Sequence, residues 1–159
     1  MNKNLKINEK TKLEGIVSFI YRNVLTGKVL RVNTYCNSIA NSFKSMIAER
    51  LAQGSNTCDI TYVAVGTGTS AFDPTDTTLD TELARSAIGS GSISSSANVV
   101  SITGFFGASE ANGVLSEIAW FGQSASATPD SGTMVNRAVI SEEKTISETL
   151  TIEGTITIS

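Results

Sequence analysis

The sequence predicts a mainly β protein: an antiparallel β-sandwich, jelly-roll-like or immunoglobulin-like, of about seven to eight strands with an inserted α-helix. β-Branched and aromatic runs separated by Gly, Ser, Asn and Thr turns favour this fold over any alternation of strands with helices. The final run, residues 146–159, alternates Leu or Ile with Thr at a strict period of two, which indicates one buried face. The other face should meet water or another subunit.

The first element is a predicted hairpin of residues 15–23 and 28–37, in which Gly27 supplies the unusual turn dihedral. After this hairpin the apolar residues recur at helical spacing. About residues 38–52 are therefore predicted to form a helix, with Asn37 or Ser38 as N-cap and Gly54 at its end. Its apolar face consists of Ile39, Phe43, Met46, Ile47 and Leu51.

Strands dominate the rest of the chain, and they are expected at residues 60–65, 99–107, 113–122, 134–141 and 146–159. Residues 60–65 show little alternation, so both faces of that strand should be covered. The Asn112-Gly113 turn signal predicts that the strands on either side of its loop, 99–107 and 113–122, pair. About residues 78–85 predict a short second helix, and the polar, glycine-rich residues 86–98 predict an exposed loop or a weak hairpin turn.

Composition limits the classes of function. A chain of 159 residues is expected to form one domain, residues 13–159, behind a flexible basic arm, residues 1–12, that holds Lys3, Lys6, Lys10 and Lys12. The formal net charge of -3 argues against nucleic-acid binding, which needs clustered cations. No run is apolar enough for membrane insertion, and the lysine-rich start lacks the apolar stretch of a signal peptide, so synthesis in the host cytoplasm is expected.

The two cysteines, Cys36 and Cys58, do not match a catalytic or metal-binding pattern, because the chain has no histidine and no C-x-x-C spacing. We expect two reduced, mostly buried thiols. A disulfide between them remains open at this point, because the spacing of the two Cα atoms decides it.

Residues 62–71, YVAVGTGTSA, match G-x-G-x-x-A through Gly66, Gly68 and Ala71 and raise the question of a dinucleotide site. Such a site needs a helix to begin at once, with its N-H groups facing the phosphates. FDPTDTTLD follows instead, which brings a proline and acidic side chains to where the phosphates would lie. We therefore expect a strand that leaves the core through a glycine loop, and no cofactor.

Catalytic and metal motifs are also weak. Residues 141–144 satisfy S-x-x-K, but they link two predicted strands instead of opening a helix. The acids Asp73, Asp76, Asp80 and Glu82 lack calcium-loop spacing, so they are expected to close turns and cap the short helix. Trp120 is expected in the core or an interface rather than stacked on a sugar. With no histidine and no fixed carboxylate pair, neither a metal site nor an enzyme is predicted.

A linked series of motifs resembles a group of small structural proteins of tailed bacteriophages, from the tail, baseplate, fibre or head decoration. A strand ending in VGTG leads to T-x-L-x-x-E-x-x-R, followed by EANG-x-x-x-E-x-x-x-F, an N-R strand and a Thr/Ile strand, over about residues 60–159. The matching positions are Val65, Gly66, Thr67, Gly68, Leu79, Glu82, Arg85, Glu110, Ala111, Asn112, Gly113, Glu117, Phe121, Asn136 and Arg137.

The resemblance implies a non-enzymatic virion component that forms a homo-oligomer and docks on other virion proteins. We expect Arg85 and Arg137 to pair with carboxylates among Glu82, Glu110 and Glu117 rather than to bind a substrate. The interface or structural candidates are Lys3, Lys6, Lys10, Lys12, Gly66, Gly68, Arg85, Asn112, Gly113, Trp120 and Arg137.

Two alternatives remain. One is a receptor-binding module that recognises host-surface glycan through loops 86–98 or 123–132, with Trp120 as the stacking platform. The other is a small hydrolase, which would need a carboxylate pair in a cleft that the sequence does not reveal.

Overall fold

The computed structural model describes residues 10–159, which contain nine β-strands, one α-helix and one short 3-10 turn. The elements in chain order are β1 (Leu13–Asn23), β2 (Val29–Ile39), α1 (Asn41–Leu51), β3 (Tyr62–Gly66), β4 (Glu82–Ala87), η1 (Ser90–Ser92), β5 (Ile93–Ser96), β6 (Val99–Phe106), β7 (Gly113–Gly122), β8 (Thr133–Lys144) and β9 (Glu148–Ile158). The prediction of a mainly β, antiparallel protein with an early helix is therefore confirmed.

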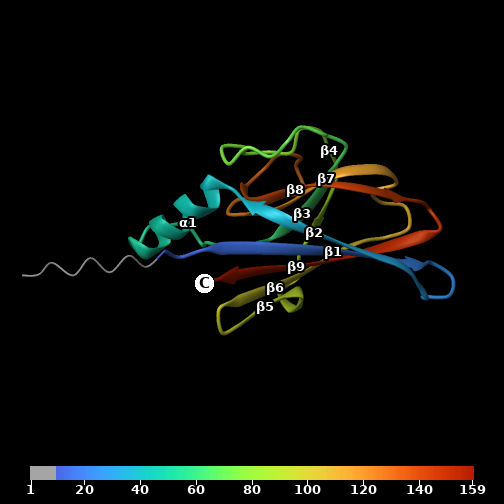
Figure 1. Cartoon of the computed structure of the whole chain (residues 1–159), viewed down its shortest axis with the longest axis horizontal. Helices are drawn as coiled ribbons and strands as arrows, with labels where there is room; N and C mark the ends of the chain where they lie inside the picture. The colour runs from blue at the N-terminus through green and yellow to red at the C-terminus, as the bar shows by residue number, and fades with distance from the viewer. Residues whose placement is uncertain (1–9) are drawn as a thin grey trace, which may run out of the picture.

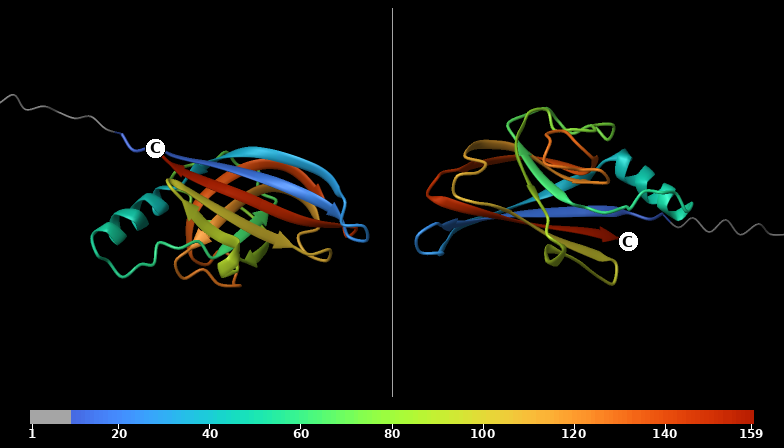
Figure 2. Two further views of the ribbon diagram at one scale, coloured as in Figure 1. Left: turned by 90° about the horizontal axis from the view of Figure 1, so that it is seen from below. Right: turned by 180° about the vertical axis from the view of Figure 1, so that it is seen from behind.

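The strands form one sheet in the order β4-β3-β7-β8-β2-β1-β9-β6-β5, and every neighbouring pair is antiparallel. This sheet curls into a half-barrel, with α1 at one end and the β1-β2 turn at the other (Figures 1 and 2). The expected sandwich of two sheets and seven to eight strands is not what forms, because β2 pairs with strands on both sides. It joins β1 along most of its length and β8 at Ser38 and Ile39.

The hydrophobic core fills the inside of the curl. Val17, Phe19 and Tyr21 of β1 and Leu150, Ile152 and Ile156 of β9 are all buried there. The opposite wall of the half-barrel, formed by β3, β7 and β8, contributes Val63, Leu115, Ile118, Trp120 and Val135. The predicted period of two in the final strand is therefore confirmed over most of its length, although its last isoleucine, Ile158, is 42% exposed.

Hairpins alternate with crossings between the two walls. β1-β2, β3-β4, β5-β6 and β7-β8 each pair with the strand next in sequence, and the turn at Gly27 has the predicted positive φ, 68°. The expected pairing of 99–107 with 113–122 is wrong: β6 pairs with β5 and β9, whereas β7 pairs with β3 and β8. Positive φ at Ala111 and Gly113, 51° and 113°, turns the chain across the core, so Phe106 and Leu115 join one cluster from opposite walls.

The helix begins later than predicted. Ser38 and Ile39 are drawn into the pairing with β8, so the N-cap is Ala40, which makes no side-chain capping bond. The predicted caps Asn37 and Ser38 were therefore wrong. Phe43 and Met46 of the predicted apolar face are buried, whereas Leu51 is 80% exposed, because α1 packs by its first turns on the end of β8 and the core.

The predicted second helix at 78–85 does not form. Glu82–Ala87 is strand β4 instead, because its residues pair with β3 from Tyr62 to Gly66. Of the two expectations for residues 86–98, the hairpin turn is the one that forms: after η1, strand β5 pairs with β6 across residues 97–98. For β3 the prediction is confirmed, because Val63 and Val65 face the core while Ala64 packs in a second cluster on the outside.

A seam lies between β2 and β8 beyond their two paired residues. Here side chains, not a backbone ladder, join the strands. The hydroxyl of Tyr35 lies 2.7 Å from the Glu142 carboxylate and 3.1 Å from the Ser141 carbonyl oxygen. Arg31 donates to the carbonyl of Glu143 and to the carboxylate of Glu148.

The close contact between Trp120 and Gly154 predicts that one added methyl group at Gly154 lowers the stability of the fold. A Cβ at Gly154 would lie 2.7 Å from Cζ2 of Trp120, so Gly154→Ala is expected to lower the free energy of unfolding by about 1–3 kcal/mol. Urea denaturation measures this. Gly89→Ala is the control, because its new Cβ would meet nothing within 4 Å, and it should be as stable as the wild type or slightly more so. Equal stability of the two variants would contradict the close wall contact.

Candidate functional site

The carboxylate of Glu117 organises the loop that follows β3. Glu117 is fully buried, and its Oε1 accepts hydrogen bonds from the N-H groups of Gly68 and Thr81, both at 2.9 Å. Its Oε2 accepts from the N-H of Asp80 at 3.0 Å. A Cβ at Gly68 would lie 2.5 Å from Oε1, and one at Gly66 would lie 2.4 Å from the Thr81 carbonyl oxygen. The glycines of the G-x-G spacing are thus required by an internal carboxylate.

Arg137 completes this cluster from β8. Its Nε donates to Oε2 of Glu117 at 3.0 Å, its Nη1 to Asp76 at 2.9 Å, and its Nη2 lies 2.9 Å from Asp80. Burial alone would lower the pKa of Arg137, but Glu117 and Asp80 hold it above its ordinary value. The pKa of Asp80 is lowered, first by its hydrogen bond from Ser70 and also by Arg137. The cluster fastens the loop of residues 67–81 to the outside of β7 and β8.

Arg85 holds the loop between β7 and β8 in a similar way. Its Nε and Nη2 donate to the two carboxylate oxygens of Glu82 at 2.6 and 2.7 Å, while Nη1 donates to the carbonyls of Ser126 and Ser131. The guanidinium also lies 5.0 Å from the centre of the Phe121 ring. The expected carboxylate pairing of both arginines is confirmed, with Glu82 and Glu117 as partners.

The four acids between residues 73 and 82 serve several separate contacts. Asp73 accepts from the N-H of Thr75 at 2.8 Å and closes a turn, as predicted. Asp76 and Asp80 face Arg137, and Glu82 faces Arg85. Across residues 10–159, no group of three His, Cys, Asp or Glu side chains is placed to hold a metal ion.

Trp120 lies in the core, with 1% of its surface exposed, so the prediction of a core position is confirmed. It cannot serve as the stacking platform that the glycan alternative requires. The S-x-x-K residues belong to β8, where Ser141 is exposed and Lys144 is buried. Opposite orientations in a strand separate the two groups and exclude the catalytic spacing that the motif would need.

The basic arm lies mostly outside the described residues, which leaves Lys3 and Lys6 without a structural account. Lys10 and Lys12 are exposed, and Lys12 forms an ion pair with Glu14. The backbone of Lys12 also bonds to Ser159, with its carbonyl accepting from the Ser159 N-H at 2.9 Å. The backbone of Lys12 is thus bonded to the residue that follows β9.

Both cysteines are free thiols, and they differ in environment. Cys58 is partly buried, and burial raises the pKa of its thiol. Cys36 is exposed on β2, so the expectation of two mostly buried cysteines is wrong for it, because its place in the strand alternation directs it outward.

A second polar cluster, inside the curl beside the seam, was missed by the sequence reasoning. Arg31 lies 3.5 Å from the ring centre of Tyr21 and donates to Glu148, which lowers the pKa of that carboxyl. Burial raises the pKa of the Tyr21 hydroxyl, and the nearby charge of Glu142 adds to this. The inward position of Glu148 could have been predicted from the alternation of the final strand, which places Glu148 on the same face as Leu150.

The outer surface of β2, β1, β9 and β6 is named here the outer face. Its three adjacent rows across the four strands are Cys36, Ile16, Thr155 and Ser101; Thr34, Ser18, Glu153 and Thr103; and Val32, Ile20, Thr151 and Phe105. Among these twelve side chains Glu153 provides the formal charge at neutral pH. Ile16, Val32 and Phe105 are large apolar groups that are 49%, 53% and 51% exposed.

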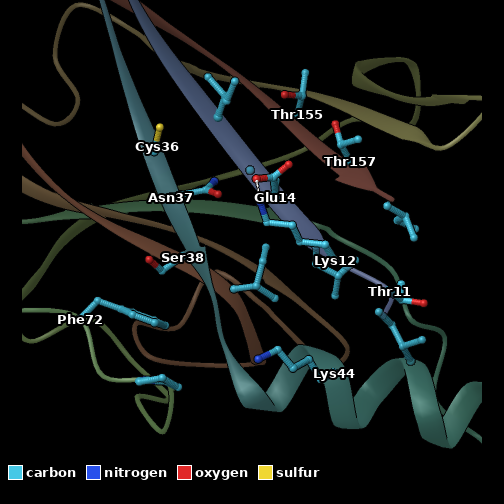
Figure 3. Close-up of a pocket in the computed structure, with 17 residues that line it drawn as sticks. Thr11, Lys12, Glu14, Cys36, Asn37, Ser38, Lys44, Phe72, Thr155 and Thr157 are labelled. Carbon is cyan, nitrogen blue, oxygen red and sulfur yellow. Dashed lines mark ion pairs between the residues drawn. The ribbon is translucent and has the colours of Figure 1, made fainter. Parts of the chain in front are cut away.

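A groove of about 1090 Å³ adjoins the outer face beside α1 (Figure 3). The helix contributes Lys44 and Ile47, the loop after β3 contributes Phe72 and Pro74, and the ends of β1, β2 and β9 supply the remaining wall. Lys12 and Glu14 lie along the strand side, and Ile16, Cys36 and Thr155 belong to both groove and outer face. The groove and the outer face therefore form one continuous surface, at the place where the basic arm enters the domain.

No family model, curated protein or solved structure matches this chain. Among residues 10–159, the structure has no helix with the length and apolar character needed to span a membrane.

The buried pair of Glu117 and Arg137 predicts a large loss of stability when one partner is removed. Arg137→Leu leaves the Glu117 carboxylate buried without its cation, and the free energy of unfolding should fall by about 3–5 kcal/mol. Chemical denaturation provides the measurement. Glu14→Gln breaks the exposed pair with Lys12 and should cost less than about 1 kcal/mol. Similar small losses in both variants would show that the buried cluster is not structural.

The lowered pKa of Glu148 predicts part of the loss of folding stability at acidic pH. Its folded pKa lies below the ordinary value of 4.5, mainly because of its hydrogen bond from Arg31. The stability that Glu148 contributes is therefore present above the ordinary pKa and is lost as the pH falls through the folded value. Glu148→Gln should show a smaller loss of melting temperature on acidification than the wild type. Glu143→Gln, an exposed change on β8, controls for charge, and an identical pH profile for wild type and Glu148→Gln would contradict this assignment.

Proposed function

We propose that this chain is a non-enzymatic structural protein of a tailed-phage virion, acting by self-association and by docking to other virion proteins. The observation that supports it best is the outer face, a broad strand surface with three half-exposed large apolar groups and little charge. Half-exposed large apolar groups set among uncharged Thr, Ser and Ile side chains suit contact with another protein surface. The motif series over about residues 60–159 supplies the virion context by resemblance.

Self-association follows from the shape and chemistry of the outer face. Strand faces pack on one another through rows of side chains at about 10 Å spacing, which suits rows of Thr, Ser, Ile and Val. Glu153 in the central row limits the contact to arrangements that hydrate or neutralise its carboxylate. Such a charge favours one specific packing over indiscriminate aggregation.

The non-enzymatic role is supported by what the acidic side chains already do. Glu117, Asp76 and Asp80 bind Arg137, and Glu82 binds Arg85, so these carboxylates are committed to holding loops. A general base needs an oxygen that faces a substrate within hydrogen-bond reach. The arginine-bound carboxylates are oriented instead toward the protein itself.

Docking to other virion proteins is assigned to the groove and the basic arm. The arm enters the domain at Lys12 on the groove wall, so a partner bound there would contact both. The apolar side chains of Ile47 and Phe72 and the exposed cation of Lys44 give the groove a mixed character. That character is typical of interfaces between separately folded proteins.

A charged substitution on the outer face tests the proposal. Phe105→Lys should reduce self-association at least tenfold, because a lysine there would have to be desolvated on packing. The measurement is mass photometry or sedimentation of the purified chain, followed by immunolabelling of purified virions from a phage encoding the variant. Fewer labelled particles and a lower oligomer mass are expected together.

The matched control is Val114→Lys, which introduces the same charge at a 59% exposed position of β7, on the other wall. It should associate and be incorporated like the wild type, and both variants should melt like the wild type because neither side chain is in the core. A monomeric wild type that is absent from virions would refute the proposal.

A further inference from the structure

Lys144 is a buried amine without a carboxylate partner. It is 1% exposed, yet it forms no ion pair with any of residues 10–159. Its Nζ contacts two neutral oxygens instead, Oδ1 of Asn112 at 3.0 Å and the carbonyl of Ala108 at 3.2 Å. Burial lowers the pKa of Lys144, because desolvation disfavours the charged ammonium form. The amine is a nucleophile in its neutral form.

The backbone holds the Asn112 side chain against this amine. Gly113 lies opposite Lys144 in the register of β7 and β8, and both neighbours of Asn112, Ala111 and Gly113, have positive φ. Nδ2 of Asn112 donates to the carbonyl of Ala108 at 2.9 Å, so the amide nitrogen and the lysine amine share one acceptor. The carbon Cγ, which is bonded to Oδ1, therefore lies beside Nζ. Reacting groups held in contact gain much of the advantage of an intramolecular reaction.

We propose that Lys144 and Asn112 form an intramolecular isopeptide bond. The neutral Nζ attacks Cγ of Asn112, a Cγ-Nζ amide bond forms, and the Cγ-Nδ2 bond breaks. The proton released by Nζ is transferred to Nδ2, which leaves as ammonia, so the step needs no oxidant and no co-reactant. A carboxyl group can relay this proton.

Glu110 is assigned to the proton relay. It precedes Asn112 by two residues, and its charge acts on Lys144, where it opposes the effect of burial on the pKa. Its Oε2 accepts from the N-H of Gly107 at 2.7 Å, which fixes the carboxyl within the same loop. Glu148 also acts on Lys144, but it is bound to Arg31 and Thr145. Glu110, unlike Glu148, has no arginine partner among residues 10–159, so the relay is assigned to it.

The bond would join the loop of residues 107–112 to the end of β8. This is the end of β8 at which side chains of β2, not backbone bonds, close the seam. A covalent link there would hold β7 and β8 together under load without any change in the strand order. The inference stands apart from the role in a virion, because it rests on these three residues alone.

The intact mass of the purified full chain tests the proposal. The wild type is expected to be lighter than its sequence by one ammonia molecule, and a protease digest is expected to contain a branched peptide joining Lys144 to Asn112. A succinimide at Asn112-Gly113 would release ammonia as well, so the branched peptide is the deciding observation. A wild-type chain at full sequence mass, with no branched peptide after prolonged incubation, would overturn the proposal.

Variants separate the two sources of a mass deficit. Lys144→Arg keeps a cation but removes the nucleophile, so it should show the full sequence mass, and Glu110→Gln should form the bond at least tenfold more slowly. Asn112→Ala should also show the full mass. A deficit that persists in Lys144→Arg, together with the absence of the branched peptide from the wild type, would assign it to a succinimide and reject the isopeptide bond.

Discussion

The closeness of the two walls of the half-barrel depends on glycine at the points where they touch. Trp120 of β7 lies against the backbone of β9 at Gly154, and Val63 of β3 lies against β6 at Gly104. Larger residues at either glycine would force the walls apart and open the packed interior to voids or strain. The curl of the sheet, the burial of Trp120 and the exposure of the opposite strand surfaces as the outer face all follow from these contacts.

Buried charge performs a second structural task, which is to hold long loops on the outside of the sheet. Arg85 binds Glu82 through both carboxylate oxygens and the loop carbonyls of Ser126 and Ser131. Arg137 binds Glu117, whose oxygens also accept bonds from the loop backbone, together with Asp76 and Asp80. This explains why Gly66 and Gly68 imitate a nucleotide fingerprint. Exposed backbone N-H groups of a glycine loop bind anions in general, and here the anion is the side chain of Glu117.

Patterns that depend on neighbours in sequence were predictable, and contacts between distant segments were not. The β1-β2 turn, the buried strand around Ala64 and the inward face of β9 follow from local periodicity. The N-cap and the strand at Glu82–Ala87 did not, because Ser38 pairs with β8 and residues 82–87 pair with β3. The pairing of β6 with β9 overrode the Asn112-Gly113 signal. The carboxylate partners of Arg85 and Arg137 were foreseen, whereas Lys144 was considered only within S-x-x-K.

The position of β9 between β1 and β6 has a consequence for how the chain acquires its structure. During translation β1 emerges first, yet its neighbour on one side is the last strand described, more than a hundred residues later. Until β9 is synthesised, the backbone N-H and C=O groups along one edge of β1 and one edge of β6 have no partner. They are then open to wrong pairing with other nascent chains. Such a high contact order favours slow, post-translational completion of the sheet, with β9 acting as its closing strand.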